Sequence, residues 1–254
     1  MRNVYTGHSG RAAFEALALL EAGFSGECDA AASILGKIYG SAFDPAKATA
    51  DLGRTWWIQR NYFKRYAAGR YSHGALDLTE ELCRTHPAFT PENIARIDVA
   101  TFFWGASMGQ QSVRSAFGCR FSIPVAMARR IVHGQVPLTD DGERAFRDPG
   151  VADLARRIFV VEDKAATAAY PDLQPTRVTV TMTDGRKVEL ASERILGEDD
   201  YPLSSAQLCA KFGELAGPGL GKATDAAWLD IARIDAVADV RALVAGWRAA
   251  ANEV

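Results

Sequence analysis

The most constraining feature of the sequence is an apolar helix close to its first residue. The segment between Arg11 and Gly23 is apolar nearly all round, a pattern typical of a helix that is buried on most sides. Ser9 can cap its start, and Gly23 suits its end. Such a helix has to lie within a helical packing layer. We expect the other helices of this layer to come from later segments or from another polypeptide.

Length and composition are those of an ordinary globular protein. The chain has 254 residues, of which 48% are hydrophobic and 24% charged, and this excludes a disordered or low-complexity protein. The length allows one large domain or two smaller ones. Lys and Arg total 29 against 31 for Asp and Glu, a net charge of −2. We therefore expect no binding of nucleic acid, and any site for an anion must be local.

The cysteines and the first residues give expectations about metal sites and location. The four cysteines are far apart and form no CxxC or Cys/His cluster, which argues against a structural zinc site and favours a reduced, cytoplasmic chain. Residues 1–8 lack the apolar core of a signal peptide, and no stretch reaches the ~18 apolar residues that span a bilayer. We expect a cytoplasmic protein with no membrane contact.

Beyond residue 60 the sequence predicts a mixture of helices and strands. Alternation over 176–182, a turn at Asp184-Gly185 and a second strand over 187–190 predict a β-hairpin. The other predicted elements are a strand over 97–103 and helices over 76–85, 122–132, 152–158, 204–216, 225–234 and 236–250. This order predicts the α+β fold class, with an α+β insertion in a helical domain.

A group of cations lies in residues 61–73, a stretch whose lack of periodicity predicts a loop. Lys64, Arg65, Arg70 and His73 alternate there with aromatic residues. These four potential cations repel one another unless carboxylates or an anionic ligand compensate them. On charge alone we favour an ordinary solvated basic surface, because charge runs usually lie at the surface.

Two smaller groups precede predicted helices. Residues 5–11 combine glycines, a hydroxyl and His8 at a place where free N–H groups favour an anion, although the same pattern makes an ordinary turn. His8 could act there as an acid or a base. The second group includes Arg120 and Ser122, and the absence of a G-x-S-x-G motif favours Ser122 as a cap rather than a nucleophile.

Three further features favour structural roles. Residues 217–222 look superficially like a phosphate loop, but Ala223 replaces the required Ser or Thr, so we interpret them as a helix connection. His86 and His133 stand without an obvious partner and are interpreted as structural.

Taken together, these residues resemble the C-terminal part of the 2-methylcitrate dehydratase family (MmgE/PrpD), which also includes cis-aconitate decarboxylase and an iminodisuccinate epimerase. The resemblance runs from about Tyr5 to about Ala216. Its markers, in order, are Gly-His-Ser-Gly-Arg-Ala-Ala at 7–13, Phe-Lys-Arg-Tyr and Ser-His within 63–73, Phe-Ser-Ile-Pro-Val-Ala-Met-Ala at 121–128 with Gly134, Asp184-Gly185, Pro202-Leu203-Ser204 and Lys211-Phe212.

The resemblance implies a helical domain that is built from both ends of a chain, with a smaller α+β lid inserted between them. In this chain, residues 1–60 and 201–254 would be the helical segments and residues 61–200 the lid. The resemblance also implies an active site between the two domains, which works without metal, cluster or organic cofactor on small di- or tricarboxylic acids.

Site residues follow from the resemblance one position at a time. Lys64 matches the family's lysine at the start of the lid, His73 the histidine that follows it, and His8 the histidine of a Lys-Pro-x-His-like motif. We expect these three to be catalytic. The residues expected around the substrate are Arg65, Arg70, Arg120, Ser122 and Tyr5. Two positions depart from the family, because Tyr5 replaces the motif lysine and Val125 a common tyrosine.

Dehydration, decarboxylation and epimerisation of such acids all develop negative charge beside a carboxylate, and fixed donors aimed at that charge are often the largest catalytic contribution. The family's N-terminal helical half, which carries an aspartate and further histidines of the site, has no counterpart in this sequence. We therefore expect a C-terminal-type subunit of a split lyase or isomerase, which pairs with a separate N-terminal-type helical chain in a hetero-oligomer. The alternatives are a non-catalytic anion-binding or scaffold protein and, last, a self-sufficient enzyme with new chemistry.

Overall fold

The computed structural model describes residues 4–139 and 142–251. It divides into two compact units, with the boundary between Trp57 and Ile58. Each unit is described below by itself.

The described part of the first unit contains three α-helices and a short π-helix. They are α1 (Tyr5–Glu21), α2 (Ala30–Ser33), the π-helix Ile34–Ile38 and α3 (Pro45–Thr49). Helix α1 confirms the predicted helix but begins several residues earlier, so Ser9 is an internal residue and not the cap. The expected burial of this helix is not found, because α1 has no buried residue and the side chain of Phe14 is 76% exposed. The short helices of this unit do not cover it.

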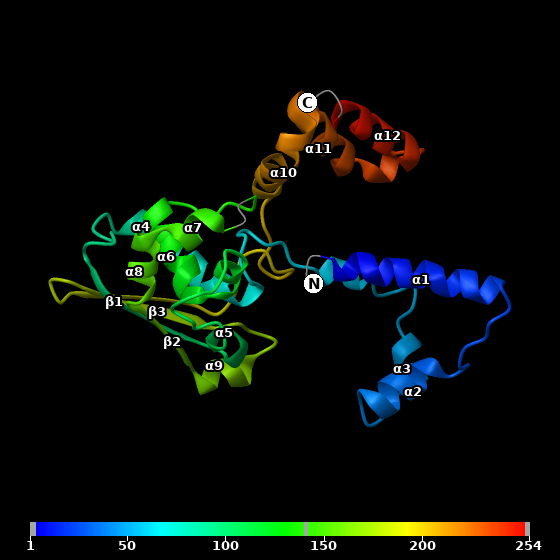
Figure 1. Cartoon of the computed structure of the whole chain (residues 1–254), viewed down its shortest axis with the longest axis horizontal. Helices are drawn as coiled ribbons and strands as arrows, with labels where there is room; N and C mark the ends of the chain where they lie inside the picture. Colours follow the sequence, from blue (N-terminus) through cyan, green and yellow to red (C-terminus); the bar gives the residue numbers. More distant parts are fainter. Residues whose placement is uncertain (1–3, 140–141, 252–254) are drawn as a thin grey trace. The chain divides into compact units, whose positions relative to one another are not determined.

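The second unit is built on a four-stranded sheet (Figure 1). The strands are β1 (Ile94–Thr101), β2 (Ile158–Glu162), β3 (Thr176–Met182) and β4 (Lys187–Ser192). Their order is β2-β1-β3-β4, with β2 parallel to β1 and with β3 antiparallel to both β1 and β4. The parallel pair requires a crossover connection, which residues 102–157 provide with their helices.

Helices α4 (His73–Thr85), α6 (Ile123–His133) and α8 (Pro149–Ala155) cover one face of this sheet (Figure 1). Side chains that alternate along the strands point into this layer, among them Ile97, Val99, Val178 and Val180, none of which is exposed to solvent. The shorter helices of the unit are α5 (Phe103–Ala106), α7 (Glu143–Arg147) and α9 (Lys164–Ala169).

The hairpin prediction is confirmed, since β3 and β4 pair in register from Thr176–Ser192 to Thr181–Lys187 and Gly185 has the positive φ of 87° that the turn requires. Strand β2 was not predicted. The expected helix over 152–158 ends at Ala155, and Ile158 already belongs to β2. The apolar run over residues 158–161 is too short for a period that would distinguish a strand from the end of a helix.

Helices α10 (Ser205–Leu220), α11 (Thr224–Ala232) and α12 (Val240–Ala251) follow the sheet and confirm the helical prediction for this region. Ser204 and Gln207 form a capping box at the start of α10. The interpretation of 217–222 as a connection is wrong for residues 217–220, because α10 continues to Leu220 with Pro218 inside it. Together with the sheet, these helices confirm the α+β class. None of the described helices has the length and apolar character needed to cross a membrane.

The cap assigned to Ser122 is confirmed. Its hydroxyl accepts a hydrogen bond from the Val125 N–H at 3.1 Å and donates one to the Gln110 carbonyl at 2.5 Å, while Gly134 ends α6 in the left-handed conformation.

We expect Ser122→Ala to lower the free energy of unfolding by about 2 kcal/mol, because two hydrogen bonds of a buried hydroxyl are lost together. Urea unfolding measures this. The matched control is Ser204→Ala at the exposed cap of α10, for which we expect about 1 kcal/mol. Equal losses of unfolding free energy in the two variants would show that the burial of Ser122 adds nothing to its contribution as a cap.

Candidate functional site

The predicted cation group lies at the start of the second unit and extends into α4. The irregular stretch ends at Gly69, because residues 70–72 form a 3-10 helix and His73 begins α4, so the prediction of a loop through residue 73 is wrong at its end. Lys64 is partly buried, and its ammonium group donates a hydrogen bond to the Ala68 carbonyl at 3.3 Å. Lys64 is thus held by the short loop that it begins.

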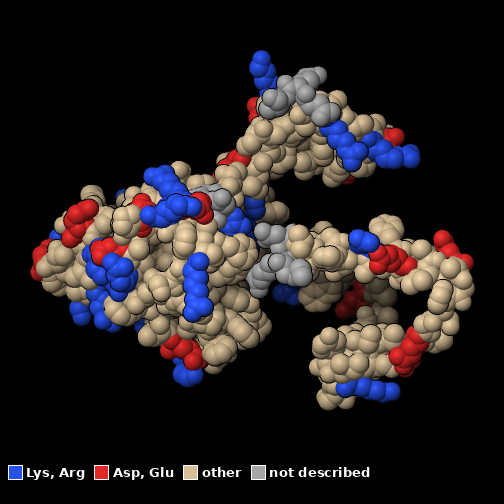
Figure 2. Space-filling view, viewed as in Figure 1, with Lys and Arg blue, Asp and Glu red and all other residues tan. Residues whose placement is uncertain are grey.

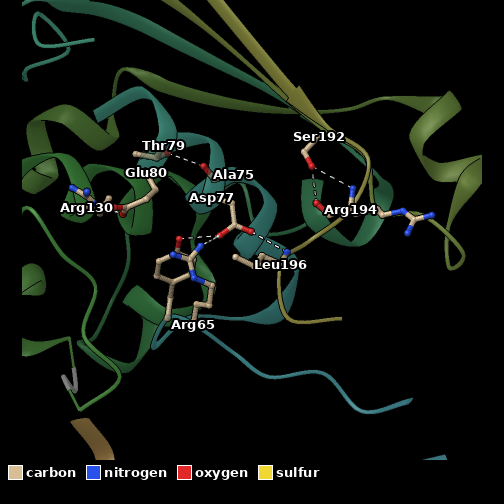
Figure 3. Close-up of polar contacts among 10 residues, drawn as sticks. Arg65, Ala75, Asp77, Thr79, Glu80, Arg130, Ser192, Arg194 and Leu196 are labelled. Atoms are coloured by element: carbon tan, nitrogen blue, oxygen red, sulfur yellow. Dashed lines mark hydrogen bonds and ion pairs between the residues drawn. The ribbon is translucent and has the colours of Figure 1, made fainter. Parts of the chain in front are cut away.

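Asp77 organises this loop from one turn inside α4 (Figure 3). Its Oδ1 accepts hydrogen bonds from the Arg65 guanidinium at 2.7 Å and from the Tyr66 hydroxyl at 2.9 Å, and its Oδ2 accepts one from the Leu196 N–H at 3.3 Å. Burial raises the pKa of Asp77, although the Arg65 charge opposes the shift. Burial also raises the pKa of the Tyr66 phenol, which therefore stays protonated as a donor.

Glu198 compensates the second arginine. Arg70 is only 7% exposed, and its Nε lies 3.1 Å from Glu198 Oε1, which also accepts from the Nη2 of the same guanidinium. Gln174 donates to that oxygen at 3.2 Å, and the Tyr62 ring lies 4.4 Å from the Arg70 guanidinium. The cations therefore do not form a solvated basic surface, because carboxylates compensate two of them.

Residues 195–198, which we call the strap, contact this loop and the helices that follow it at three points. The Phe63 N–H donates to the Gly197 carbonyl at 2.9 Å, the Leu196 N–H reaches Asp77, and Glu198 pairs with Arg70. Gly197 has a φ of 103°, and a Cβ at this position would overlap the Phe63 carbonyl oxygen. Only glycine therefore lets the strap approach so closely to the residue before Lys64.

His73 is buried at the first position of α4, with 0% of its surface exposed. Burial and, next, the Arg70 charge lower its pKa to about 3, while the nearby Ala68 carbonyl opposes the shift. Neither ring nitrogen makes a hydrogen bond of regular geometry to the described residues. At neutral pH His73 is a neutral imidazole that can exchange a hydrogen bond but does not supply a positive charge.

This environment makes stability depend on pH. The pKa of His73 is about 3 in the folded chain against an ordinary value of 6.5. Between these pH values the unfolded chain binds more protons, so acid favours unfolding. We expect the free energy of unfolding to fall on acidification below pH 6.5, by up to about 1.4 kcal/mol per pH unit from this residue.

Urea titrations at several pH values would measure this slope, and His73→Leu is expected to remove the His73 contribution. The raised pKa of Asp77 affects the pH dependence of the unfolding free energy with the opposite sign. The slope of the wild type is therefore compared with the slope of the variant, and not with a slope of zero. An unchanged slope in His73→Leu would contradict the assignment.

The predicted group that includes Arg120 and Ser122 contacts the cation group of residues 64–73 through backbone atoms. The Gly69 N–H donates to the Arg120 carbonyl at 2.5 Å, while the Arg120 guanidinium lies 5.9 Å from the Phe117 ring. Ser122 uses its hydroxyl as the cap of α6. Residues 117–122 therefore support the loop that carries Lys64, and the side chain of Ser122 has a structural partner on both of its hydrogen bonds.

Tyr5 and His8 belong to the first unit, whereas Lys64 and His73 belong to the second. The prediction that residues 5–11 form a loop before a helix is wrong, since all of them lie inside α1. Glycine inside a helix costs only about 1 kcal/mol, and the Ala, Leu and Glu residues at positions 12–21 of the same helix are strong helix formers that offset the two glycines. The side chains of Tyr5 and His8 are exposed.

Sequence reasoning missed the carboxylates of this site. Asp77 had a local signal, because it lies one helical turn beyond His73 at the start of a predicted helix. Glu198 had none, since 128 positions separate it from Arg70. His133, interpreted as structural, pairs with Asp148 at 2.7 Å. Within the described ranges no group of three His, Cys, Asp or Glu residues could hold a metal ion.

Comparison with protein families gives one match. The model of the MmgE/PrpD C-terminal domain matches residues 66–235, about two thirds of the chain. This chain belongs to the MmgE/PrpD family. The matched range contains His73, Asp77 and Ser122, whereas Tyr5, His8 and Lys64 precede it. A search of curated proteins found no significant match. MmgE/PrpD proteins are generally enzymes, dehydratases among them.

Proposed function

We propose that this chain is the C-terminal-type subunit of a split MmgE/PrpD lyase or isomerase that acts, without a cofactor, on a small di- or tricarboxylic acid. Family membership is the observation that carries the proposal. Lys64 is assigned to stabilise the negative charge that develops beside a substrate carboxylate, a task for which a fixed cation is effective. Asp77 and Glu198 hold the arginines beside it, so Arg65 and Arg70 position the loop.

A separate N-terminal-type helical subunit is the partner in this proposal. Helix α1 presents apolar side chains to solvent, with Leu17 56% and Leu20 63% exposed in addition to Phe14. Figure 2 shows a largely uncharged surface over α1. Contiguous exposed apolar surface of this kind marks interaction sites. All four cysteines are free thiols, which supports the cytoplasmic location that we also propose.

The test is the native mass of the complex purified through a tag on this chain. We expect a second chain with an N-terminal-type MmgE/PrpD sequence, and turnover of a small polycarboxylate by the pair. Phe14→Glu should abolish pairing, whereas the matched control Glu15→Gln on the same helix should not. A stably folded lone chain that turns over nothing would contradict the proposal.

A non-catalytic anion-binding or scaffold protein is the second candidate. The compensation of Arg65 and Arg70 by carboxylates and the low pKa of His73 favour it, because both reduce the charge that a reacting acid would meet. Calorimetry separates the two candidates. Carboxylate binding without turnover, even beside the partner chain, would support the second one.

A further inference from the structure

A cavity of about 200 Å³ lies at the other end of α4, where this helix meets the β3–β4 hairpin. The cavity is independent of the Lys64 loop. The residues lining it come from the end of α4, from the segment after it and from the hairpin, and His86 follows His73 by 13 positions. At the helical rise of 1.5 Å per residue, the two ends of α4 are separated by roughly 20 Å.

The wall of the cavity is apolar. Leu82 and Val180 are fully buried, Met182 and Phe89 are 6% exposed, and Val188 completes the wall. A well-packed domain contains few voids of this size, and an engineered apolar cavity of about 150 Å³ stays dry and binds benzene. Phe89 and the Met182 thioether are favourable neighbours for an aromatic ring. The space and its wall therefore suit one aromatic ring.

The mouth of the cavity carries positive charge. Arg186 directly precedes β4, two positions before Val188, and lines the cavity. Its Nε donates to Asp184 at 2.7 Å, and among the described residues no acceptor engages its two terminal guanidinium nitrogens. Lys187 and His86 also line the cavity. At the hairpin turn, Arg186 and Lys187 outnumber the carboxylate of Asp184. This net positive charge favours an anionic group at the opening.

We propose that this cavity binds an aromatic monocarboxylate, with its ring between α4 and the hairpin and its carboxylate at Arg186. The site is separate from the Lys64 loop and does not depend on the proposed reaction. An arginine is suited to the head group because its planar fork matches the geometry of a carboxylate.

The test is a titration of the full chain with phenylacetate, followed by amide and methyl chemical shifts. We expect a Kd on the order of 1 mM, with shifts at Leu82, Val180 and Val188. The neutral isostere phenylacetamide and the variant Arg186→Gln should each weaken binding by about tenfold. The matched control is Arg147→Gln, which removes another exposed arginine with a local carboxylate partner and should leave binding unchanged.

Two variants test the position of the ring. Val188→Phe fills the cavity, and Ala88→Trp blocks it from an exposed position where a large side chain leaves the core intact. Both should abolish the shifts. Binding that survives both variants, or that is equally strong for phenylacetamide, would overturn the proposal, as would the absence of shifts in the folded wild-type chain. None of these results depends on turnover by the assembled enzyme.

Discussion

Lys64→Ala is expected to lower kcat/KM of the assembled enzyme by about 10²–10³-fold, the usual effect of removing one fixed donor from a site where negative charge develops. The reason lies in the geometry of the loop. The ammonium group is held by the Ala68 carbonyl, and the strap fixes the preceding residue through the Phe63 and Gly197 backbones. A donor held in this way meets the developing charge without reorganisation, which water or a mobile side chain cannot do.

Steady-state kinetics of the reconstituted pair would measure this effect. The matched control is Lys164→Ala, which removes an exposed lysine at the start of α9 that pairs with Glu162 at the end of β2. We expect the control to keep wild-type turnover. Equal activity of Lys64→Ala and the wild type would show that Lys64 has only a structural role and would favour the binding-protein candidate.

Asp77→Ala should have the largest effect on stability among the polar residues of the site, about 3 kcal/mol of the free energy of unfolding. Its side chain is the shared acceptor for Arg65, Tyr66 and Leu196 (Figure 3). Alanine would leave a guanidinium and a buried phenol without this acceptor. Side-chain exposures of 27% for Arg65 and 18% for Asp77 place the expected loss at the lower end of the range for buried pairs.

Urea unfolding at neutral pH would measure this loss. Glu81→Ala is the control in the same helix, because its pair with Arg84 is exposed on both sides and should contribute about 0.5 kcal/mol or less. A double-mutant cycle of Arg65→Ala with Asp77→Ala would isolate the coupling between the two. If Asp77→Ala and Glu81→Ala cost the same, Asp77 would not organise the loop.

Local signals in the sequence predicted most of the helices and one hairpin. Ser122 and Gly134 bound α6 as their side-chain and backbone preferences require, and Asp184-Gly185 gives the turn between β3 and β4. The errors have local causes too. Strand β2 has five residues, too few for a period, and the glycines of residues 5–11 suggested a loop where the chain continues as helix α1.

The candidate site was likewise predicted only in part from the sequence. The sequence shows that the cations of residues 64–73 need compensation, since like charges at this spacing repel. It does not show which carboxylates provide it. Asp77 is nearby in sequence, but Glu198 comes from beyond the hairpin and reaches Arg70 only because β4 returns the chain to the start of α4. Long-range contacts decide whether a protein carboxylate or an anionic ligand compensates such a cation, and no local sequence pattern predicts the outcome.

By itself the sequence determined the α+β class, the apolar character of α1 and the concentration of cations before α4, because periodicity, capping and charge are properties of neighbouring residues. Only the tertiary structure decided the exposure of α1, the neutral state of His73 and the pairing of Arg65 and Arg70. Burial and the pairing of charges depend on residues that are distant in the chain, and solvation energies of several kcal/mol follow from those distant contacts and not from the identity of the residue.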